Sequence, residues 1–132
     1  MNINTSEFAL IIPLDKNKIV YGEYRYYEFE AVRLLKSFRK NAGIFKNINI
    51  YIFKNKNIDI SKNTINEINK MHNVFLFEDE VKNPNKYKFI NIPYTGYYFT
   101  NVKKIKEKYT FYFDLDCEIV NPINKDFIEK MI

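Results

Sequence analysis

The chain has 132 residues, of which 46% are hydrophobic and 17% aromatic, and it carries a formal net charge of +5. This length and composition predict a single globular domain over residues 1–132 and exclude a disordered chain. No apolar run reaches the roughly 18 residues of a membrane-spanning helix, and the first residues lack a basic start and a small-residue cleavage site. We therefore expect a cytoplasmic location, either free or at the cytoplasmic face of a membrane.

The positive charge comes from scattered lysines and not from an arginine-rich stripe. The accompanying excess of asparagine, isoleucine and tyrosine is the composition that A/T-rich codons produce, so we expect no nucleic-acid partner. Cys117 and His72 are the single cysteine and the single histidine, which excludes an internal disulfide and metal sites built from cysteine or histidine pairs. A bound metal would need oxygen ligands.

In the first part of the chain, two strand-like runs enclose a helix-like stretch. Residues 8–14, FALIIPL, form a continuous apolar run of the kind found in strands buried on both faces. Residues 23–41 have helical periodicity, with glutamates early and basic residues late, and Gly43 follows as a helix-ending signal. Residues 48–53, INIYIF, predict the second strand.

The middle of the chain repeats this alternation on a smaller scale. Residues 61–72 predict a short helix, with Ser61 or Thr64 as its N-cap. Residues 74–78, VFLFE, predict the third strand, and residues 78–93 form a polar stretch with two prolines that indicates a long loop.

The last part of the chain predicts a further helix, a strand and the start of another helix. The helix is expected after Pro93 from apolar residues at helical spacing, namely Tyr98, Val102, Ile105 and Tyr109. Residues 110–116, TFYFDLD, predict the fourth strand, and a helix begins near residue 124. Alternating strands and helices are typical of an α/β fold. We expect a Rossmann-like three-layer sandwich with a mainly parallel sheet.

The fourth strand is expected to deliver Asp114 and Asp116 to the edge of the sheet where ligands of α/β proteins bind. Alternation along a strand places Tyr112 and both aspartates on one face, with the two Asp Cα atoms about 6–7 Å apart. A divalent cation such as Mg²⁺ or Mn²⁺, carrying phosphate oxygens, would offset the repulsion between the carboxylates. The alternative is that one aspartate caps the last helix and the other is solvated in a turn.

Other phosphate-binding devices are missing from the sequence. No G-x-G-x-x-G motif follows a strand and no G-x-x-x-x-G-K-[ST] motif occurs, which argues against a dinucleotide site and a P-loop. A bound diphosphate would then be held mainly through the metal. Glu118 could add a third oxygen ligand if the strand continues straight beyond Asp116.

The segment FYFDLDCEIVNPI at residues 111–123 resembles the D-x-D region of GT-A-fold glycosyltransferases, especially the glycogenin and lipopolysaccharide-galactosyltransferase type. Residues 30–53 resemble the first helix and second strand of that family, and residues 8–14 resemble its first strand. The resemblance follows the order and spacing of most of the chain, and D-x-D is its one specific motif.

This resemblance implies a glycosyltransferase whose donor is a nucleoside diphosphate sugar bound through Mn²⁺ or Mg²⁺. It implies that Asp116 ligates the metal most directly and that Asp114 contacts the ribose and the metal. Leu115 would lie against the nucleotide, and Pro13 and Leu14 would flank the base.

The acceptor implied by the resemblance is a hydroxyl group on a glycan, a lipid-linked glycan or a protein, and peripheral membrane contact fits that chemistry. The family often has a basic residue at the start of the helix before D-x-D. Tyr97 falls at that position here, so Lys103 is the nearest candidate for a phosphate contact.

Two alternatives remain open. The acceptor-binding and catalytic segments of the family follow D-x-D by many tens of residues, whereas 16 residues follow Asp116 here. The chain could therefore be a truncated, non-catalytic module that binds a nucleotide or a partner.

The same motif also resembles motif one of haloacid-dehalogenase phosphatases, with Asp114 as nucleophile and Asp116 as acid. Against this, Glu118 stands where that family prefers Thr or Val, and its motif ends the first strand.

Overall fold

A computed structural model describes residues 3–82 and 91–132. Its main sheet contains β1 (Phe8–Leu14), β4 (Asn49–Asn55), β5 (Val74–Asp79) and β6 (Tyr109–Tyr112), and a small hairpin contains β2 (Lys18–Val20) and β3 (Glu23–Arg25). The helices are α1 (Tyr27–Asn41), α2 (Lys62–Asn69), α3 (Asn91–Tyr97) and α4 (Lys125–Met131). Short 3₁₀ turns span Thr5–Glu7 and Gly43–Phe45, and a π-helical turn, η3 (Tyr98–Val102), continues α3.

The four strands of the main sheet are parallel and lie in the order β5-β4-β1-β6. Along the chain these are the third, second, first and fourth main-sheet strands, so the direction in which strands are added reverses between β1 and β6. This arrangement confirms the expected α/β fold with a mainly parallel sheet.

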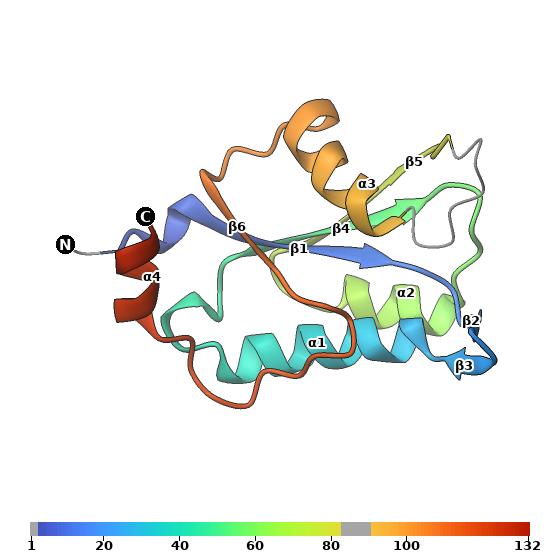
Figure 1. The fold of residues 1–132 in the computed structure, drawn as a ribbon, viewed down its shortest axis with the longest axis horizontal. Coiled ribbons are helices and arrows are strands. Elements are labelled where there is room, and N and C mark those ends of the chain that lie inside the picture. Colours follow the sequence, from blue (N-terminus) through green and yellow to red (C-terminus); the bar gives the residue numbers. More distant parts are fainter. Residues whose placement is uncertain (1–2, 83–90) are drawn as a thin grey trace.

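Helices cover both faces of the sheet, with α1 and α2 on one face and α3 on the other (Figure 1). Leu10 and Ile12 of β1 join the cluster formed with α1, whereas Ala9 and Ile11 join the cluster formed with η3. Every residue of β1 is buried, which explains why its sequence is apolar without alternation. No helix within residues 3–82 and 91–132 is long and apolar enough to cross a membrane.

The predicted helix over 23–41 begins later than expected, at Tyr27. Glu23–Arg25 instead forms β3, which pairs antiparallel with β2 across a two-residue turn. The turn residues Tyr21 and Gly22 both have positive φ, at 50° and 81°. Two positive φ values define the type I′ turn that suits a tight hairpin, because its twist matches that of the flanking strands.

The helix expected after Pro93 also has different bounds. It begins before Pro93, at Asn91, and the helical backbone ends with η3 at Val102. Ile105 lies outside it, and Tyr109 begins β6. Residues 83–90, half of the predicted loop, lie outside the described part of the chain.

The remaining elements agree with the sequence to within a few residues. Of the two N-cap candidates for α2, Ser61 fills that position, and its Oγ accepts a hydrogen bond from the backbone N–H of Thr64 at 3.3 Å. Gly43 follows the end of α1 with a φ of 68°.

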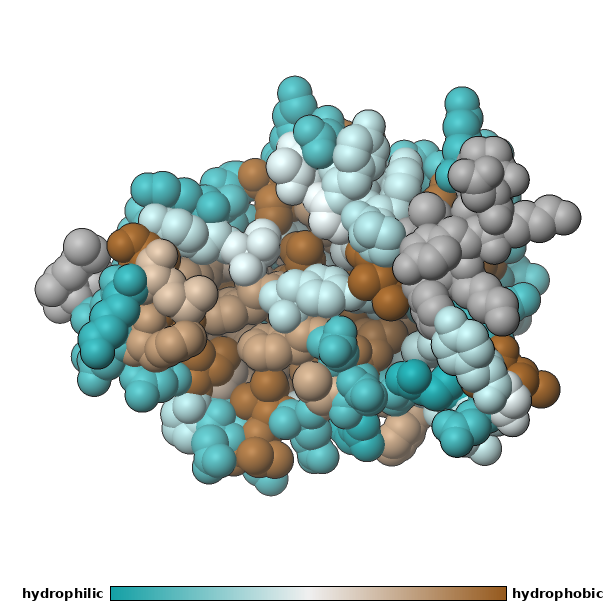
Figure 2. All heavy atoms as spheres, in the orientation of Figure 1, coloured by the Kyte–Doolittle hydropathy of each residue, from teal (hydrophilic) through white to brown (hydrophobic). Residues whose placement is uncertain are grey.

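Figure 2 shows apolar atoms gathered over β6, the segment that follows it and α4.

Candidate functional site

The predicted fourth strand is shorter than expected, because β6 ends at Tyr112 and both aspartates follow it in a turn. The backbone N–H of Cys117 donates to the carbonyl oxygen of Asp114 at 2.9 Å and closes this turn. The alternation of faces continues nevertheless. Phe113 and Leu115 point inward, whereas Asp114 and Asp116 are exposed. We call residues 113–120 the aspartate loop.

A stripe of polar side chains on α1 fixes the backbone of the aspartate loop. Arg33 donates to the carbonyl oxygen of Asp116 at 3.1 Å, and Asn41 donates to that of Ile119 at 2.7 Å. Between them, Ser37 Oγ accepts from the backbone N–H of Ile119 at 2.9 Å. The three helix residues are four positions apart, so they lie along one side of α1. The loop is therefore positioned by the helix rather than by sheet pairing.

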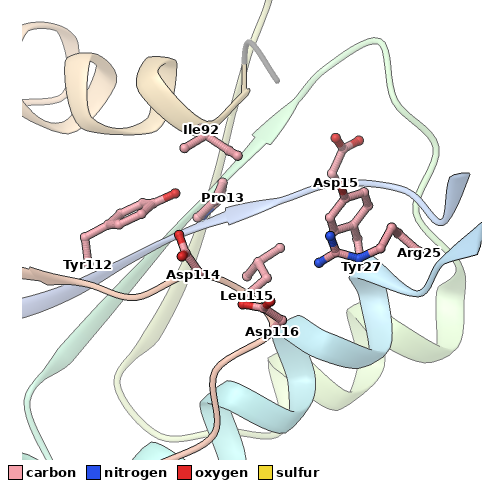
Figure 3. Close-up of a pocket in the computed structure, with 9 residues that line it drawn as sticks. All are labelled: Pro13, Asp15, Arg25, Tyr27, Ile92, Tyr112, Asp114, Leu115 and Asp116. Carbon is pink, nitrogen blue, oxygen red and sulfur yellow. The ribbon is translucent and has the colours of Figure 1, made fainter. Parts of the chain in front are cut away.

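A cavity of about 200 Å³ lies beside the aspartate loop (Figure 3). Its lining residues come from the ends of β1 and β6, the hairpin, α1, α3 and the loop: Pro13, Asp15, Arg25, Tyr27, Ile92, Tyr112, Asp114, Leu115 and Asp116. The cavity therefore sits at the carboxyl ends of β1 and β6, between which the strand order reverses. This switch point is where open α/β sheets generally bind ligands.

Asp114 and Asp116 present carboxylates to this cavity from the two sides of Leu115 in the turn. Within the described residues, neither side chain forms a hydrogen bond or an ion pair, so their oxygens are available to a ligand. The same part of the chain contains no group of three or more His, Cys, Asp or Glu side chains that could hold a metal. Two carboxylates suit a hard cation that takes its other ligands from water or phosphate oxygens.

Tyr112 borders the cavity next to Asp114. Partial desolvation, assisted by the negative charge of Asp114, raises the pKa of Tyr112 to about 12, although 39% of the residue remains exposed. Like any tyrosine, it is protonated at neutral pH, and it can donate a hydrogen bond to an oxygen atom of a ligand.

Arg25 borders the cavity from the opposite side, at the end of β3. Its Nη2 donates to Glu30 Oε1 at 2.7 Å, and its guanidinium carbon lies 4.8 Å from the centre of the Tyr27 ring. The hydrogen bond to Glu30 raises the pKa of Arg25, and the charges of Glu30, Tyr27 and Asp116 act in the same direction against partial desolvation. Arg25 is thus a fixed positive charge near Asp116.

Asp15, directly after β1, is the third aspartate of the cavity wall. Its Oδ2 pairs with the Lys18 ammonium at 2.7 Å, and its Oδ1 accepts from the backbone N–H of Lys16 at 2.8 Å. In Figure 3 its carboxylate points away from the aspartate loop. These contacts assign Asp15 to the hairpin connection rather than to the pair of free carboxylates.

The structure brings four of the predicted site residues to one cavity: Pro13, Asp114, Leu115 and Asp116. Leu14 lies elsewhere, because its side chain is fully buried in the core between β1 and α1.

Lys103 and Glu118 also lie away from the cavity. The Lys103 ammonium lies 5.1 Å from the centre of the Phe77 ring, in a shallow hollow beside β4 and β5. Glu118 lines an open groove along α1 and α2, so the structure does not place it with Asp116 as a third ligand.

Five lining residues were not among the predicted site residues, namely Asp15, Arg25, Tyr27, Ile92 and Tyr112. Helical periodicity over residues 23–41 places the Arg25 side chain on a helical face, and so it gives no indication of the position of Arg25 at the cavity. The Tyr21-Gly22 pair was the available signal for the hairpin. Strand alternation places Tyr112 on the same face as the aspartates but indicates no role for it.

Comparison with known proteins returns no match to any family model, to any curated protein or to any solved structure.

Proposed function

We propose that this chain binds a nucleoside diphosphate sugar through Mn²⁺ or Mg²⁺ at Asp114 and Asp116. We further propose that it acts as a metal-dependent glycosyltransferase toward an acceptor hydroxyl on a glycan, a lipid-linked glycan or a protein. The observation that carries the proposal is the position of the two free carboxylates. They border a cavity at the switch point of a parallel sheet, in a chain without a glycine-rich phosphate loop.

In this proposal, different residues of the cavity contact different parts of the donor. Asp114 and Asp116 hold the cation, and Tyr112 donates to an oxygen of the ribose or the diphosphate. Pro13 and Leu115 provide apolar walls for the nucleotide. When bound, the cation would supply positive charge that stabilises the departing nucleoside diphosphate. Leu14 and Lys103 receive no direct contact with the donor, because neither borders the cavity. A cytoplasmic location belongs to this proposal and is tested by cell fractionation.

The test is a calorimetric titration of uridine diphosphate (UDP) into the protein with Mn²⁺ and with EDTA. We expect binding in Mn²⁺ that is lost in EDTA. We also expect Asp116→Asn to weaken the binding by about 10-fold or more, or about 1.4 kcal/mol, because the variant removes a charged metal ligand. Asp59→Asn is the matched control, since Asp59 is an exposed aspartate outside the cavity lining.

Binding that persists in EDTA, or that is unchanged in Asp116→Asn, would contradict the metal-dependent site. Release of UDP from a UDP-sugar, measured next, separates a transferase from a non-catalytic nucleotide-binding module. Release of phosphate from a small phosphomonoester would support the phosphatase alternative instead.

A further inference from the structure

Arg25 occupies a position in the cavity that the proposed donor site does not yet use. Its side chain reaches across from β3, and Figure 3 shows the guanidinium end directed toward Leu115 and Asp116. Two contacts fix that direction. Glu30, in the first turn of α1, accepts a hydrogen bond at 2.7 Å, and the Tyr27 ring lies against the guanidinium with its centre 4.8 Å from the carbon. The guanidinium is therefore held in place before any ligand binds.

Most of the hydrogen-bonding capacity of Arg25 is unused. An arginine side chain has five N–H donors, and within residues 3–82 and 91–132 the hydrogen bond to Glu30 uses one of them. The side chain remains 34% exposed, on the cavity side of a well-buried carboxylate. A planar set of free N–H donors at a cavity wall is the geometry with which proteins recognise phosphate oxygens.

The charges around the cavity decide what Arg25 can bind. Asp15 is paired with Lys18, and Glu30 is paired with Arg25, so within the described residues the two carboxylates of the aspartate loop have no direct ion-pair partner. A bare anion would be repelled by Asp114 and Asp116. A diphosphate that arrives with a divalent cation brings the charge that these two residues lack, and its outward oxygens then face Arg25.

We propose that Arg25 is the phosphate-binding residue of this cavity, donating to the diphosphate from the side opposite the cation held by Asp114 and Asp116. This inference rests on the proposed function. It assigns to one arginine, fixed by Glu30 and Tyr27, the phosphate contact for which the sequence had suggested Lys103. The Glu30 pairing is a positioning contact, because Glu30 acts on the ligand through Arg25.

The experiment compares two affinities in the same variants. Manganese binding alone is measured by electron paramagnetic resonance, and UDP and pyrophosphate binding are measured by calorimetry in saturating Mn²⁺. In Arg25→Met we expect the affinity for both phosphate ligands to fall by about 10- to 100-fold, the effect of losing a charge-assisted hydrogen bond. Manganese affinity should stay the same or rise, because a positive charge near Asp116 has been removed.

Matched variants separate this role from a structural one. Lys46→Met makes the same charge change at an exposed position outside the cavity lining and should leave all affinities unchanged. Arg25→Lys keeps the charge but loses the planar fork, and should recover part of the phosphate affinity. Because Arg25→Met leaves Glu30 buried without its partner, the double variant Arg25→Met/Glu30→Gln removes that charge, and it should show the same loss of phosphate affinity.

Each contrary outcome has a distinct meaning. If UDP binding requires Mn²⁺ and Asp116 but is unchanged in Arg25→Met, this inference is wrong and the proposed function stands. If Arg25→Met weakens binding of UDP but not of pyrophosphate, Arg25 contacts another part of the nucleotide and the inference is also wrong. Equal losses of manganese and phosphate affinity in both the single and the double variant would show a purely structural role.

Discussion

Tyr51 shows at the scale of a single residue how burial and a charged neighbour act together. Tyr51 is 8% exposed, and its hydroxyl donates to Glu107 Oε1 at 2.8 Å. Burial and then the contact with Glu107 raise the pKa of Tyr51 to about 12, above the value near 10 of an unfolded chain. The stabilisation that the protonated phenol provides is therefore complete below pH 10, and it is lost as the pH rises from 10 toward 12.

Replacing Tyr51 with Phe removes this titration and the hydrogen bond to Glu107. At pH 8 we expect the variant to be less stable by about 1 kcal/mol, because among the described residues Glu107 then keeps the hydrogen bond from Asn49, at 3.1 Å, and no other. Above pH 10 its free energy of unfolding should fall less steeply than that of the original protein. Urea unfolding at a series of pH values measures both effects. An identical slope above pH 10 would show that Tyr51 does not titrate with a raised pKa.

Individual residues also show how much of the site could be predicted from the sequence. Asp114 and Asp116 could be found because D-x-D at the end of an apolar run is a local pattern, and so could their neighbour Leu115. Arg25 could not be found in this way. Its place in the cavity depends on a hairpin, for which the Tyr21-Gly22 pair is the one local signal, and on a pairing with Glu30, which no local pattern predicts.

At the scale of the element, α1 determines the shape of the aspartate loop. Ser37 is buried within the helix, and its Oγ joins two elements by donating to the carbonyl oxygen of Leu34 at 3.1 Å and accepting from the N–H of Ile119. Without this acceptor, the amide of Ile119 would have to find water or remain unpaired at the edge of the core.

We expect Ser37→Ala to lower the free energy of unfolding by about 1–3 kcal/mol, the cost of an unsatisfied buried donor. We also expect it to weaken Mn²⁺-dependent UDP binding, because the aspartate loop loses one of its three links to α1. Lys40→Ala is the control on the same helix, since Lys40 is exposed and has no hydrogen bond to the loop. Chemical denaturation and calorimetry provide the two measurements. A stability loss without any change in affinity would contradict the link between helix and site.

Elements also differ in how well the sequence predicted them. The strand over Phe8–Leu14 was predicted with the correct bounds, because a strand buried on both faces is apolar throughout. The start of α1 was wrong, because Tyr24 and Tyr27 fall at helical spacing while the backbone between them belongs to two different elements. Hydrophobic periodicity indicates which side chains share a face of an element. It gives no information about a turn that is formed by two residues with positive φ.

At the scale of the whole molecule, strand order creates the cavity. The alternation of strands and helices predicts a parallel sheet, but it leaves open which neighbour the last strand takes. Here β6 lies beside β1 and not beside β5, which brings Tyr112 and the aspartate loop to the end of β1. Long-range packing decides this placement, including Phe113 against Phe38 of α1 with ring centres 6.4 Å apart.

Strand order also predicts how stability is distributed across the sheet. β1 and β4 each pair with strands on both sides, whereas β6 has four residues and pairs, within the described chain, with β1 alone. We expect the amides of β1 and β4 to be the slowest to exchange with solvent and those of β6 to exchange faster. Hydrogen–deuterium exchange followed by NMR tests this. Protection in β6 equal to that in β4 would indicate that the sheet opens as one unit.

One feature of α1 joins the two sides of the cavity. Its first turn anchors Arg25 through Glu30, and its middle anchors the aspartate loop through Arg33 and Ser37. A small rotation of α1 relative to the sheet would therefore carry the arginine and the aspartates together and conserve the spacing between them. The distance that changes would be the one to Pro13 on β1, so the space for the proposed nucleotide base could vary while the proposed contacts with the diphosphate kept their spacing.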